Sequence, residues 1–441
     1  LNPSKPFLPP YYPPLYSSVS LWRMIIQGVP SGGTMLRTLL LAVLMASASL
    51  AGCFGEEEFE LIPHDSSQST EFRPYTVIAP IDTGINPYHN HFQTDEILPD
   101  WFIEDMQTTI ICNLTQEGTY QERVDADRAT CWDTITASDI VYFPGTRIFA
   151  QSPDGGTPTM ILDDPNDGHG TAVTGAVIDA DPDAIIFFVE GFSENAVNTA
   201  GNHPMVDVIT TSFGAIGSLP VPGIEDATKI AVVENHKIHT GAADNTPSPA
   251  VQDATAGPPW SIGVSGYAEG DDDQKETMSG SYPDMASDWT QVLPNHDDVD
   301  GYHETSGTSF ATPRTAGFLG HIMTSLRAEF SDNGSGGRDG FLVDGDVQIT
   351  NSDIRNALNL SGWYPSSDSW DPSGGTTPIS PILPCTQVGW GVLNWSNIDP
   401  MIQHLNGSST LPSRSSDVNS CMEANQAARE AYWGAYPAEQ E

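Results

Sequence analysis

Basic residues are scarce in this sequence. Lysine and arginine together number 16 against 58 aspartate and glutamate residues in a chain of 441, which gives a formal net charge of −42. Nucleic-acid binding needs a basic face, so this composition argues against a nucleic-acid partner. The acidic surface favours a soluble monomer adapted to a salty medium that screens its self-repulsion. The length allows one large domain or two ordinary ones, and 38% hydrophobic residues are enough for a core.

Long apolar runs are also missing, apart from one near the N-terminus. Residues 35–52 combine a basic residue, an apolar stretch too short for a typical spanning helix and a small-residue exit, the layout of a secretory signal. They end at Cys53, and Leu-Ala-Gly-Cys is similar to the lipobox of prokaryotic lipoproteins. That resemblance implies cleavage before Cys53, a lipid on its sulfur and membrane contact at the extracellular face of the cell membrane. An ordinary signal peptide with an incidental cysteine is the alternative.

Closely spaced cysteine pairs are absent as well, since none of the five cysteines forms the C-x-x-C motif typical of zinc sites. Once Cys53 is set aside for the lipid, Cys112, Cys131, Cys385 and Cys421 remain. An even number of cysteines in an exported protein indicates disulfides. Three pairings are open, and closeness in sequence favours Cys112–Cys131 and Cys385–Cys421.

The apolar runs that are present mostly lack the alternation of a half-exposed strand, so they predict strands covered on both faces. Strands are expected at 75–82, 184–190, 206–213, 237–244 and 261–267. Helices are expected at 169–180, 224–236 and about 309–329. This pattern predicts an α/β domain with a mostly parallel sheet, in which ligand sites lie at the carboxyl ends of the strands.

Several stretches interrupt this pattern. Residues 91–165 form a long irregular insertion that holds the first cysteine pair, and 268–300 are expected to be acidic surface loops. Only a short loop is expected between the strand ending near residue 190 and the one starting at 206. After about residue 405 the chain becomes a polar tail that ends in a short helix.

Three motifs carry residue types used in nucleophilic catalysis. Asp82 ends the first predicted strand in Asp-Thr-Gly, a motif that aspartic proteases share, but those enzymes need two such carboxylates and no second motif is present. His169 stands between two glycines, which let backbone or substrate come close. Ser309 stands where a Gly-Thr turn enters a helix of small residues. A serine there is usually a helix cap, but this hydroxyl could also lie exposed at the positive end of the helix dipole.

The order Asp82, His169, Ser309 and the three surrounding motifs resemble those of the subtilisin-like serine proteases, the subtilases. The resemblance implies a three-layer α/β fold with a mostly parallel central sheet flanked by helices. It also implies that Ser309 is the nucleophile, that His169 is the general base and that Asp82 orients the imidazole. The expected activity is that of a serine endopeptidase acting on protein or peptide substrates in extended conformation.

The resemblance extends to the substrate cleft. Residues 209–215, Ile-Thr-Thr-Ser-Phe-Gly-Ala, are similar to the edge strand along which substrate pairs, and imply that Ser212, Phe213 and Gly214 line the primary pocket. Asn245 is similar to the asparagine of the oxyanion hole. A turn asparagine is the alternative for this residue, because its surroundings are rich in turn formers.

The chain also departs from the family pattern. Asp244 stands where a glycine commonly precedes the oxyanion-hole asparagine, and the spacing from Asp82 to His169 is long. Pro80 falls in what should be an interior strand, where a missing N–H donor is awkward.

Other functions are weighed against the protease. A catalytically inactive surface lipoprotein that binds peptides is one alternative, and a serine hydrolase of another fold would show Gly-x-Ser-x-Gly and the order Ser, acid, His. The close histidine pairs 89/91 and 236/239 are better explained by surface or core roles, so no metal site is assigned. No cofactor is required; structural calcium is common among subtilases, but the many carboxylates do not identify its ligands.

The sequence therefore predicts a domain order that runs from an export segment to a peptidase domain. The predicted parts are an upstream extension at 1–34, a lipoprotein signal peptide at 35–52, an acidic tether at 53–74, a subtilase-like peptidase domain at 75–405 and a C-terminal extension at 406–441.

Overall fold

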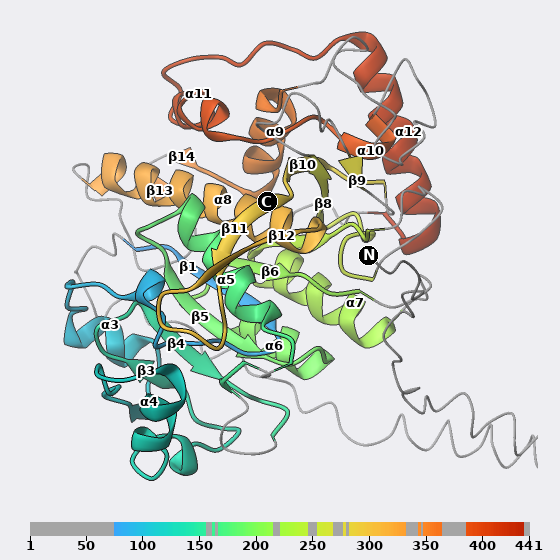
Figure 1. Cartoon of the computed structure of the whole chain (residues 1–441). Helices are drawn as coiled ribbons and strands as arrows, with labels where there is room; N and C mark the ends of the chain where they lie inside the picture. Colours follow the sequence, from blue (N-terminus) through green and yellow to red (C-terminus); the bar gives the residue numbers. More distant parts are fainter. Residues whose placement is uncertain are drawn as a thin grey trace, which may run out of the picture. The chain divides into compact units, whose positions relative to one another are not determined.

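Two compact units make up the chain, Leu1–Pro63 and His64–Glu441. The computed structural model describes residues 75–155, 161–163, 166–214, 221–245, 254–267, 277–278, 282–331, 343–344, 347–363 and 385–435, all of them in the second unit (Figure 1). The signal segment, Cys53 and the acidic tether lie outside the described residues. Within the described residues, no helix is both long and apolar enough to span a membrane.

A ten-stranded sheet forms the centre of this unit, in the order β10-β8-β7-β6-β1-β5-β4-β3-β2, with β9 paired to β8. All these pairs are parallel except β3 with β4 and β8 with β9. The strands are β1 (Val77–Asp82), β2 (Ile110–Ile111), β3 (Val141–Phe143), β4 (Ile148–Gln151), β5 (Ile185–Glu190), β6 (Val208–Thr211), β7 (Ile238–Ala242), β8 (Ile262–Tyr267), β9 (Thr277–Met278) and β10 (Met285–Asp288). The prediction of a mostly parallel sheet is confirmed, and its five strands are all present.

Helices cover both faces of the sheet. Successive residues of β1 show this. Ile78 packs in the cluster that includes Phe318 of α8 (Thr308–Ser331), whereas Val77 and Ala79 pack in the cluster that includes Ala196 of α6 (Glu194–Asn202). Side chains that alternate between two cores are what a strand buried on both faces requires. The result is the predicted three-layer α/β fold.

The helices flanking the sheet are α5 (His169–Ala180), α6 (Glu194–Asn202), α7 (Pro222–Lys229), which continues as a π-helical turn at Ile230–Glu234, and α8 (Thr308–Ser331). Helix α5 has the predicted bounds. Helices α5 and α8 approach closely, because a Cβ at Gly317 would lie 2.5 Å from the Val177 carbonyl oxygen. The expectation of a mere loop before β6 is wrong. Ser193 caps α6, whose buried face is made of the small residues Ala196, Val197, Ala200 and Gly201.

The predicted insertion is more regular than its sequence suggests. It contributes β2, β3 and β4 to one edge of the central sheet, together with α3 (Asp100–Asp105), α4 (Tyr120–Asp127) and the 3-10 turns Asn90–Phe92 and Trp132–Thr134. A disulfide joins Cys112 to Cys131, as predicted.

The region predicted to be acidic loops also contains strands. Strands β11 (Thr290–Pro294) and β12 (Tyr302–Ser306) form an antiparallel hairpin, whose two strands are joined by the loop 295–301. The hairpin leads directly into α8, so it delivers Ser309 to the carboxyl end of the sheet.

The C-terminal part adds β13 (Val343–Asp344), β14 (Val347–Gln348), α9 (Asn351–Ser361), α10 (Cys385–Val388), α11 (Trp395–Leu405) and α12 (Ser416–Trp433). The terminal helix is longer than expected, because Ser415 caps it inside the predicted polar tail. The predicted disulfide Cys385–Cys421 ties α12 to α10.

Pro80 is accommodated within the sheet interior by an interruption of one strand pairing. It faces Thr210 of β6 in register, whereas pairing of β1 with β5 runs through Val77, Ile78, Ile81 and Asp82 and skips Ala79 and Pro80. Because proline has no N–H to donate, Pro80 cannot form a ladder bond to β5, and the gap in the pairing lies on that side.

Candidate active site

Asp82 and His169 form a hydrogen-bonded pair at the carboxyl end of β1. The Asp82 side chain is fully buried, and its Oδ1 lies 2.7 Å from Nδ1 of His169 and 2.8 Å from the backbone N–H of Thr83. No described residue donates to Oδ2 of Asp82. A carboxylate bonded to Nδ1 holds the imidazole with Nε2 directed away from it, as a general base requires.

Glycine makes this approach possible. Gly168 precedes α5 in the left-handed region (φ 73°), and a Cβ at Gly170 would lie 2.1 Å from the carbonyl oxygen of Gly84. A side chain at Gly170 would push the segment after β1 away from α5, and a Cβ at Gly168 would lie 2.2 Å from Nδ1 of His296. The glycines on either side of His169 therefore allow close packing, one against the backbone and one against a side chain.

A second buried carboxylate, Asp163, braces this pair. Its Oδ1 accepts the Thr83 hydroxyl (2.7 Å), and its Oδ2 accepts both the N–H (2.8 Å) and the hydroxyl (2.6 Å) of Thr171. The Thr83 hydroxyl oxygen in turn accepts the N–H of Gly170 (2.9 Å). Asp163 thus joins the residue after Asp82 to the first turn of the His169 helix. Sequence reasoning missed it.

Ser309 lies in the first turn of α8, beside His169. The imidazole packs on the ring of Phe310 with 5.4 Å between centroids. The Ser309 hydroxyl donates to the carbonyl oxygen of Ser212 (3.3 Å), and no described contact joins it to His169. Hydrogen bonds between a nucleophile and its base are often long or poorly aligned without substrate, so this arrangement does not argue against Ser309 as the nucleophile.

Pro313 has a role in placing this turn. Helix α8 begins at Thr308, so Pro313 is past its first turn, and the N–H that it lacks would have bonded to the carbonyl of Ser309. That carbonyl instead accepts the hydroxyl of Ser212 (2.7 Å). Ser212 and Ser309 are therefore joined by two hydrogen bonds, one from each hydroxyl to the other residue's carbonyl oxygen. These bonds hold the predicted pocket residue Ser212 against the candidate nucleophile.

Asn245 lies at the N-terminus of the same helix. Its Oδ1 accepts the N–H (2.9 Å) and the hydroxyl (3.0 Å) of Thr308. Because a backbone N–H can only donate, the oxygen must face Thr308, which leaves the Nδ2 donor on the other side of the amide. Asp244 adopts φ 67°, which explains why glycine is common at this position. The structure brings Asn245 next to Ser309, as expected.

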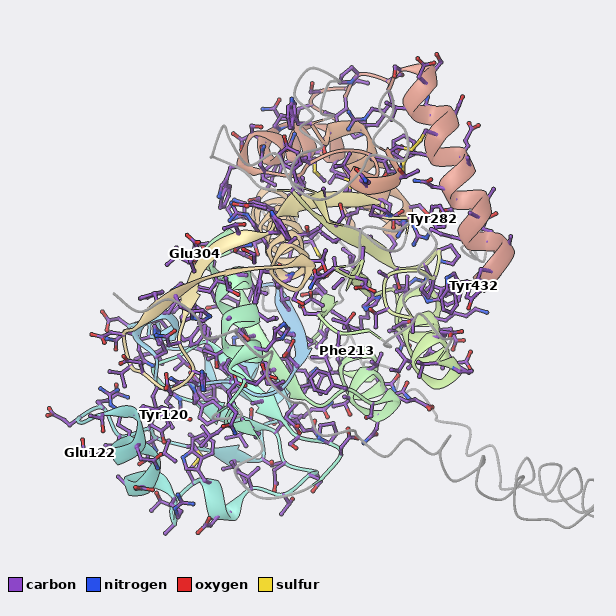
Figure 2. The ribbon with its side chains drawn as sticks, turned by 45° about the vertical axis from the view of Figure 1, so that its right-hand side comes forward. Tyr120, Glu122, Phe213, Tyr282, Glu304 and Tyr432 are labelled. Carbon is purple, nitrogen blue, oxygen red and sulfur yellow. A yellow bond between two sulfur atoms is a disulfide. The ribbon has the colours of Figure 1, made fainter. Side chains whose placement is uncertain are left out.

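The predicted pocket residues follow β6, although β6 is not an edge strand. It pairs with β1 on one side and β7 on the other, so the expectation of an edge over 209–211 is wrong. The chain leaves the sheet at its carboxyl end through Ser212, Phe213 and Gly214. Phe213 (labelled in Figure 2) packs edge-on against Phe192, with 5.1 Å between the ring centroids. Phe192 is 48% exposed. This aromatic pair is a second feature that the sequence did not reveal.

Negative charge dominates the electrostatics of the site. Burial by itself lowers the pKa of His169, but the charge and hydrogen bond of Asp82, aided by Asp167 and Asp163, outweigh it and raise the pKa to about 9. Burial raises the pKa of Asp163 to about 6, against the hydrogen bonds from Thr171 and Thr83. Burial also raises the pKa of Glu190, which stands next to Asp82 in register and accepts the hydroxyl of Ser152.

The described residues contain no group of histidine, cysteine, aspartate and glutamate side chains suited to hold a metal ion. His89 and His239 are buried and hydrogen-bonded, the first to the carbonyl of Gly301 and the second to Thr211 and Ser261. These two histidines have the core roles expected for them.

Residues 74–334 match the model of the subtilase family, peptidase S8. The chain belongs to the subtilase family. This membership supports serine protease activity and agrees with the three-layer fold described above. The family match ends at residue 334, just after α8, so the C-terminal helices of this subtilase lie outside it.

Solved structures similar to this subtilase include a prenylagaramide maturation protease, PagA, and a lanthipeptide protease. The first has 17% identity and a TM-score of 0.44, and the similarity covers 77% of this chain and 96% of that one. The second has 13% identity and a TM-score of 0.46, with 76% and 89% covered. At these values the two structures add nothing to the family match. No curated protein matches the sequence significantly.

Proposed function

We propose that this subtilase is a serine endopeptidase that uses Ser309, His169 and Asp82 to hydrolyse peptide bonds. The observation that supports this most directly is the 2.7 Å contact between His169 and the buried Asp82, beside the first turn of the helix that carries Ser309. In the reaction, the Ser309 hydroxyl attacks the peptide carbonyl and passes its proton to Nε2 of His169. The imidazolium then gives that proton to the leaving amine as the C–N bond breaks, which leaves the acyl group on Ser309. Water, deprotonated by His169, then hydrolyses this ester and frees the Ser309 hydroxyl.

The charge that develops on the attacked carbonyl oxygen needs donors. The backbone N–H of Ser309 belongs to the first turn of α8, where N–H groups have no partner within the helix and the helix dipole is positive. The Nδ2 of Asn245 is the second donor, since its Oδ1 is held by Thr308. Such preorganised donors act mainly in the transition state.

Substrate would bind in extended conformation along residues 212–214, just beyond the end of β6. An extended segment exposes its scissile carbonyl and offers backbone groups for pairing. Phe213 and the exposed Phe192 give this part of the site an apolar character, which suits unfolded protein or peptide substrates.

Export and anchoring complete the proposal. The signal-like segment 35–52 followed by Cys53 supports a lipoprotein held at the extracellular face of the cell membrane. The two disulfides support an oxidising compartment. Substitution of Cys53 by serine should release the protein into the medium, and unchanged membrane association of that variant would contradict the lipid anchor.

The deciding experiment combines activity with labelling. The purified protein is incubated with denatured protein substrate, with and without a fluorophosphonate, and the labelled peptide is mapped. We expect cleavage, label on Ser309, and loss of turnover by about 10⁶-fold in Ser309→Ala or His169→Ala. Peptide binding without cleavage by the wild-type protein would favour the alternative, an inactive peptide-binding lipoprotein. Label on another serine would exclude the assigned nucleophile.

A further inference from the structure

Residues 254–261 form an irregular segment that is entirely buried. Its backbone belongs to no helix or strand, yet buried carbonyl groups require hydrogen-bond donors. The segment packs directly on the sheet, because a Cβ at Gly241 of β7 would lie 2.4 Å from the carbonyl oxygen of Thr255. Within the segment, the N–H of Ser261 donates to the carbonyl oxygen of Pro258 (3.0 Å), and further donors come from elsewhere in the chain.

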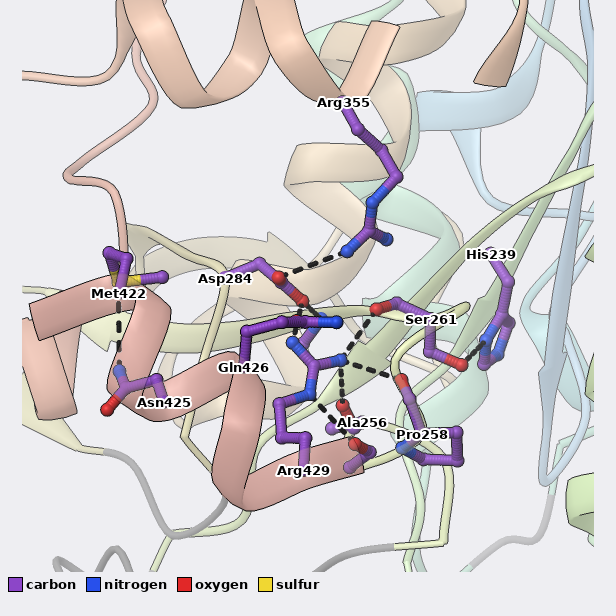
Figure 3. Close-up of polar contacts among 12 residues, drawn as sticks. His239, Ala256, Pro258, Ser261, Asp284, Arg355, Met422, Asn425, Gln426 and Arg429 are labelled. Carbon is purple, nitrogen blue, oxygen red and sulfur yellow. Dashed lines mark hydrogen bonds and ion pairs between the residues drawn. The ribbon is translucent and has the colours of Figure 1, made fainter. Parts of the chain in front are cut away.

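Arg429 of α12 supplies them. Its side chain is 1% exposed. Its guanidinium donates to the carbonyl oxygens of Gly257 (2.8 Å), Ala256 (3.2 Å), Pro258 (2.6 Å) and Ser261 (2.9 Å). Figure 3 shows this fan of contacts from the C-terminal helix.

Asp284 balances the charge of the guanidinium. Its Oδ2 accepts Nη1 of Arg429 (2.6 Å) and the N–H of Gly263, the second residue of β8 (2.8 Å), while its Oδ1 accepts Arg355 (3.1 Å). The guanidinium is therefore fixed in position by a charged partner as well as by the carbonyls (Figure 3). Its planar set of donors suits such a cluster of acceptors.

The segment that Arg429 holds contacts the candidate substrate cleft. The hydroxyl of Thr255 donates to the carbonyl oxygen of Phe213 (2.8 Å). Phe213 follows Ser212, which contacts Ser309 twice. An unbroken series of hydrogen bonds and peptide bonds thus runs from Arg429 through Thr255 to the residues around Ser309.

A second series reaches the same place through the core. Nδ1 of His239 lies 2.7 Å from the hydroxyl of Ser261, and Nε2 lies 2.9 Å from the hydroxyl of Thr211, the residue before Ser212. Burial lowers the pKa of His239 to about 3, so this imidazole stays neutral. The segment held by Arg429 is therefore linked to residues 211–213 at both ends, through Thr255 at one end and through Ser261 and His239 at the other.

We propose that Arg429 is a positioning residue for the substrate pocket, acting through Thr255 on Phe213. This inference rests on the proposed protease function, because it assigns residues 212–214 to the substrate. The family match ends before α12, so this part of the pocket's support lies outside the matched region. The disulfide Cys385–Cys421 and the bond from Asn425 to the Cys385 carbonyl (3.2 Å) hold α12 in place.

The test compares two buried arginines. Arg429→Lys keeps a positive charge beside Asp284 but loses the planar set of donors. Arg327→Lys is the matched control, because Arg327 is also 1% exposed and pairs with a buried carboxylate, Asp207, away from the pocket. A second pair tests the connection itself: Thr255→Val removes the donor to Phe213, and Thr255→Ser retains it.

Steady-state kinetics are measured on fluorophosphonate-titrated enzyme, below the melting temperature of every variant. The substrates are two peptides with phenylalanine or alanine before the scissile bond. We expect Arg429→Lys and Thr255→Val to raise KM for the phenylalanine peptide on the order of tenfold and to change the ratio between the two peptides. Thr255→Ser and Arg327→Lys should keep the wild-type ratio.

Hydrogen exchange at residues 210–214 gives a readout that does not require activity. We expect faster exchange in Arg429→Lys and Thr255→Val and wild-type exchange in the two controls. Wild-type KM, peptide ratio and exchange in both Arg429→Lys and Thr255→Val would overturn the inference, as would equal changes in Arg327→Lys. A wild-type protein that neither cleaves nor reacts with the fluorophosphonate would overturn the proposed function instead. If Arg429→Lys fails to fold, the Thr255 pair decides.

Discussion

Each end of strand β1 lies beside a buried carboxylate, and the two carboxylates differ in how many of their oxygens accept hydrogen bonds. At the amino end, Arg327 donates to both oxygens of Asp207 (2.7 and 3.2 Å), which also accepts the N–H of Val77 (2.8 Å). At the carboxyl end, Asp82 uses one oxygen for His169 and Thr83, while no described residue donates to the other. One strand thus connects a compensated carboxylate to one with an unused acceptor.

This difference separates stability from chemistry. Breaking a buried ion pair is costly, because removing one partner leaves an uncompensated charge. An incompletely satisfied carboxylate next to an imidazole keeps the proton affinity of that imidazole high. Substitutions at the two ends should therefore have opposite effects on stability and turnover.

The largest effect is expected from a matched pair of amide substitutions. Asp82→Asn should lower kcat by about 10⁴-fold, because it favours the wrong tautomer of His169. Its melting temperature should change little when measured above pH 9, where His169 is neutral in the wild type as well. Asp207→Asn should leave kcat per titrated site unchanged but cost about 3–5 kcal/mol of unfolding free energy, since Arg327 loses its charged partner. Active-site titration together with denaturant unfolding measures both. Equal losses of kcat in the two variants would contradict the separation.

Asn245 tests the donor side of the same site. Asn245→Ala should lower kcat by about 10²–10³-fold with little change in KM. Asn245→Asp is the sharper variant, because it keeps an acceptor for Thr308 but has no Nδ2 donor, and it should lose at least as much. Normal kcat with a lowered melting point would show that Asn245 is only a turn residue.

Asp163 and Asp127 provide a comparison between two buried carboxylates with similar bonds. Asp127 accepts the N–H and hydroxyl of Thr115 and the hydroxyl of Tyr88, inside the insertion. We expect Asp163→Asn to lower kcat/KM on the order of tenfold, because an amide cannot accept all three of its hydrogen bonds. Asp127→Asn should affect only stability. Kinetics and thermal unfolding of the two variants check this, and unchanged kcat/KM in Asp163→Asn would contradict it.

The smallest expected effect concerns pH. His169 must be neutral to act as a base, so kcat/KM should rise with pH through about 9. The raised pKa contributes stability that is full below the unfolded value near 6.5 and is lost as pH rises through 9, so stability should fall as activity increases. Asp167→Asn should lower the apparent pKa by a fraction of a unit, and high salt should remove that difference. A profile with its midpoint near 6.5 in the wild type would contradict this.

Sequence predicted the parts of this subtilase whose signal is local. A few consecutive residues are enough to predict the buried strands β1 and β5 and the small-residue helix α5. The same holds for the motifs around Asp82, His169 and Ser309. The interior position of β6 is not local, since it depends on which strands pair on either side. Helix α6 was not predicted because its sequence, Glu-Asn-Ala-Val-Asn-Thr-Ala-Gly-Asn, is rich in asparagine, threonine and glycine, which have low helix propensity.

Polar residues at buried positions explain the other failures. Helix α12 buries Asn425 and Arg429 on the face that contacts the domain, so its sequence resembles a solvated tail. Asp163 acts by joining Thr83 to Thr171, and Thr83 lies 80 residues away in sequence. No pattern within a single motif identifies a residue whose role depends on distant partners.

The reach of Arg429 has a consequence for the order of folding. Its partners Ala256, Gly257, Pro258 and Ser261 precede it by 168–173 residues. Contacts between segments so far apart form late, because the entropy of closing the intervening loop must be overcome first. Until α12 docks, the carbonyls of Ala256, Gly257 and Ser261 lack the donors that Arg429 supplies. The candidate triad can therefore assemble before the wall of its pocket does, and the last helix of the domain completes a site that begins at its first strand.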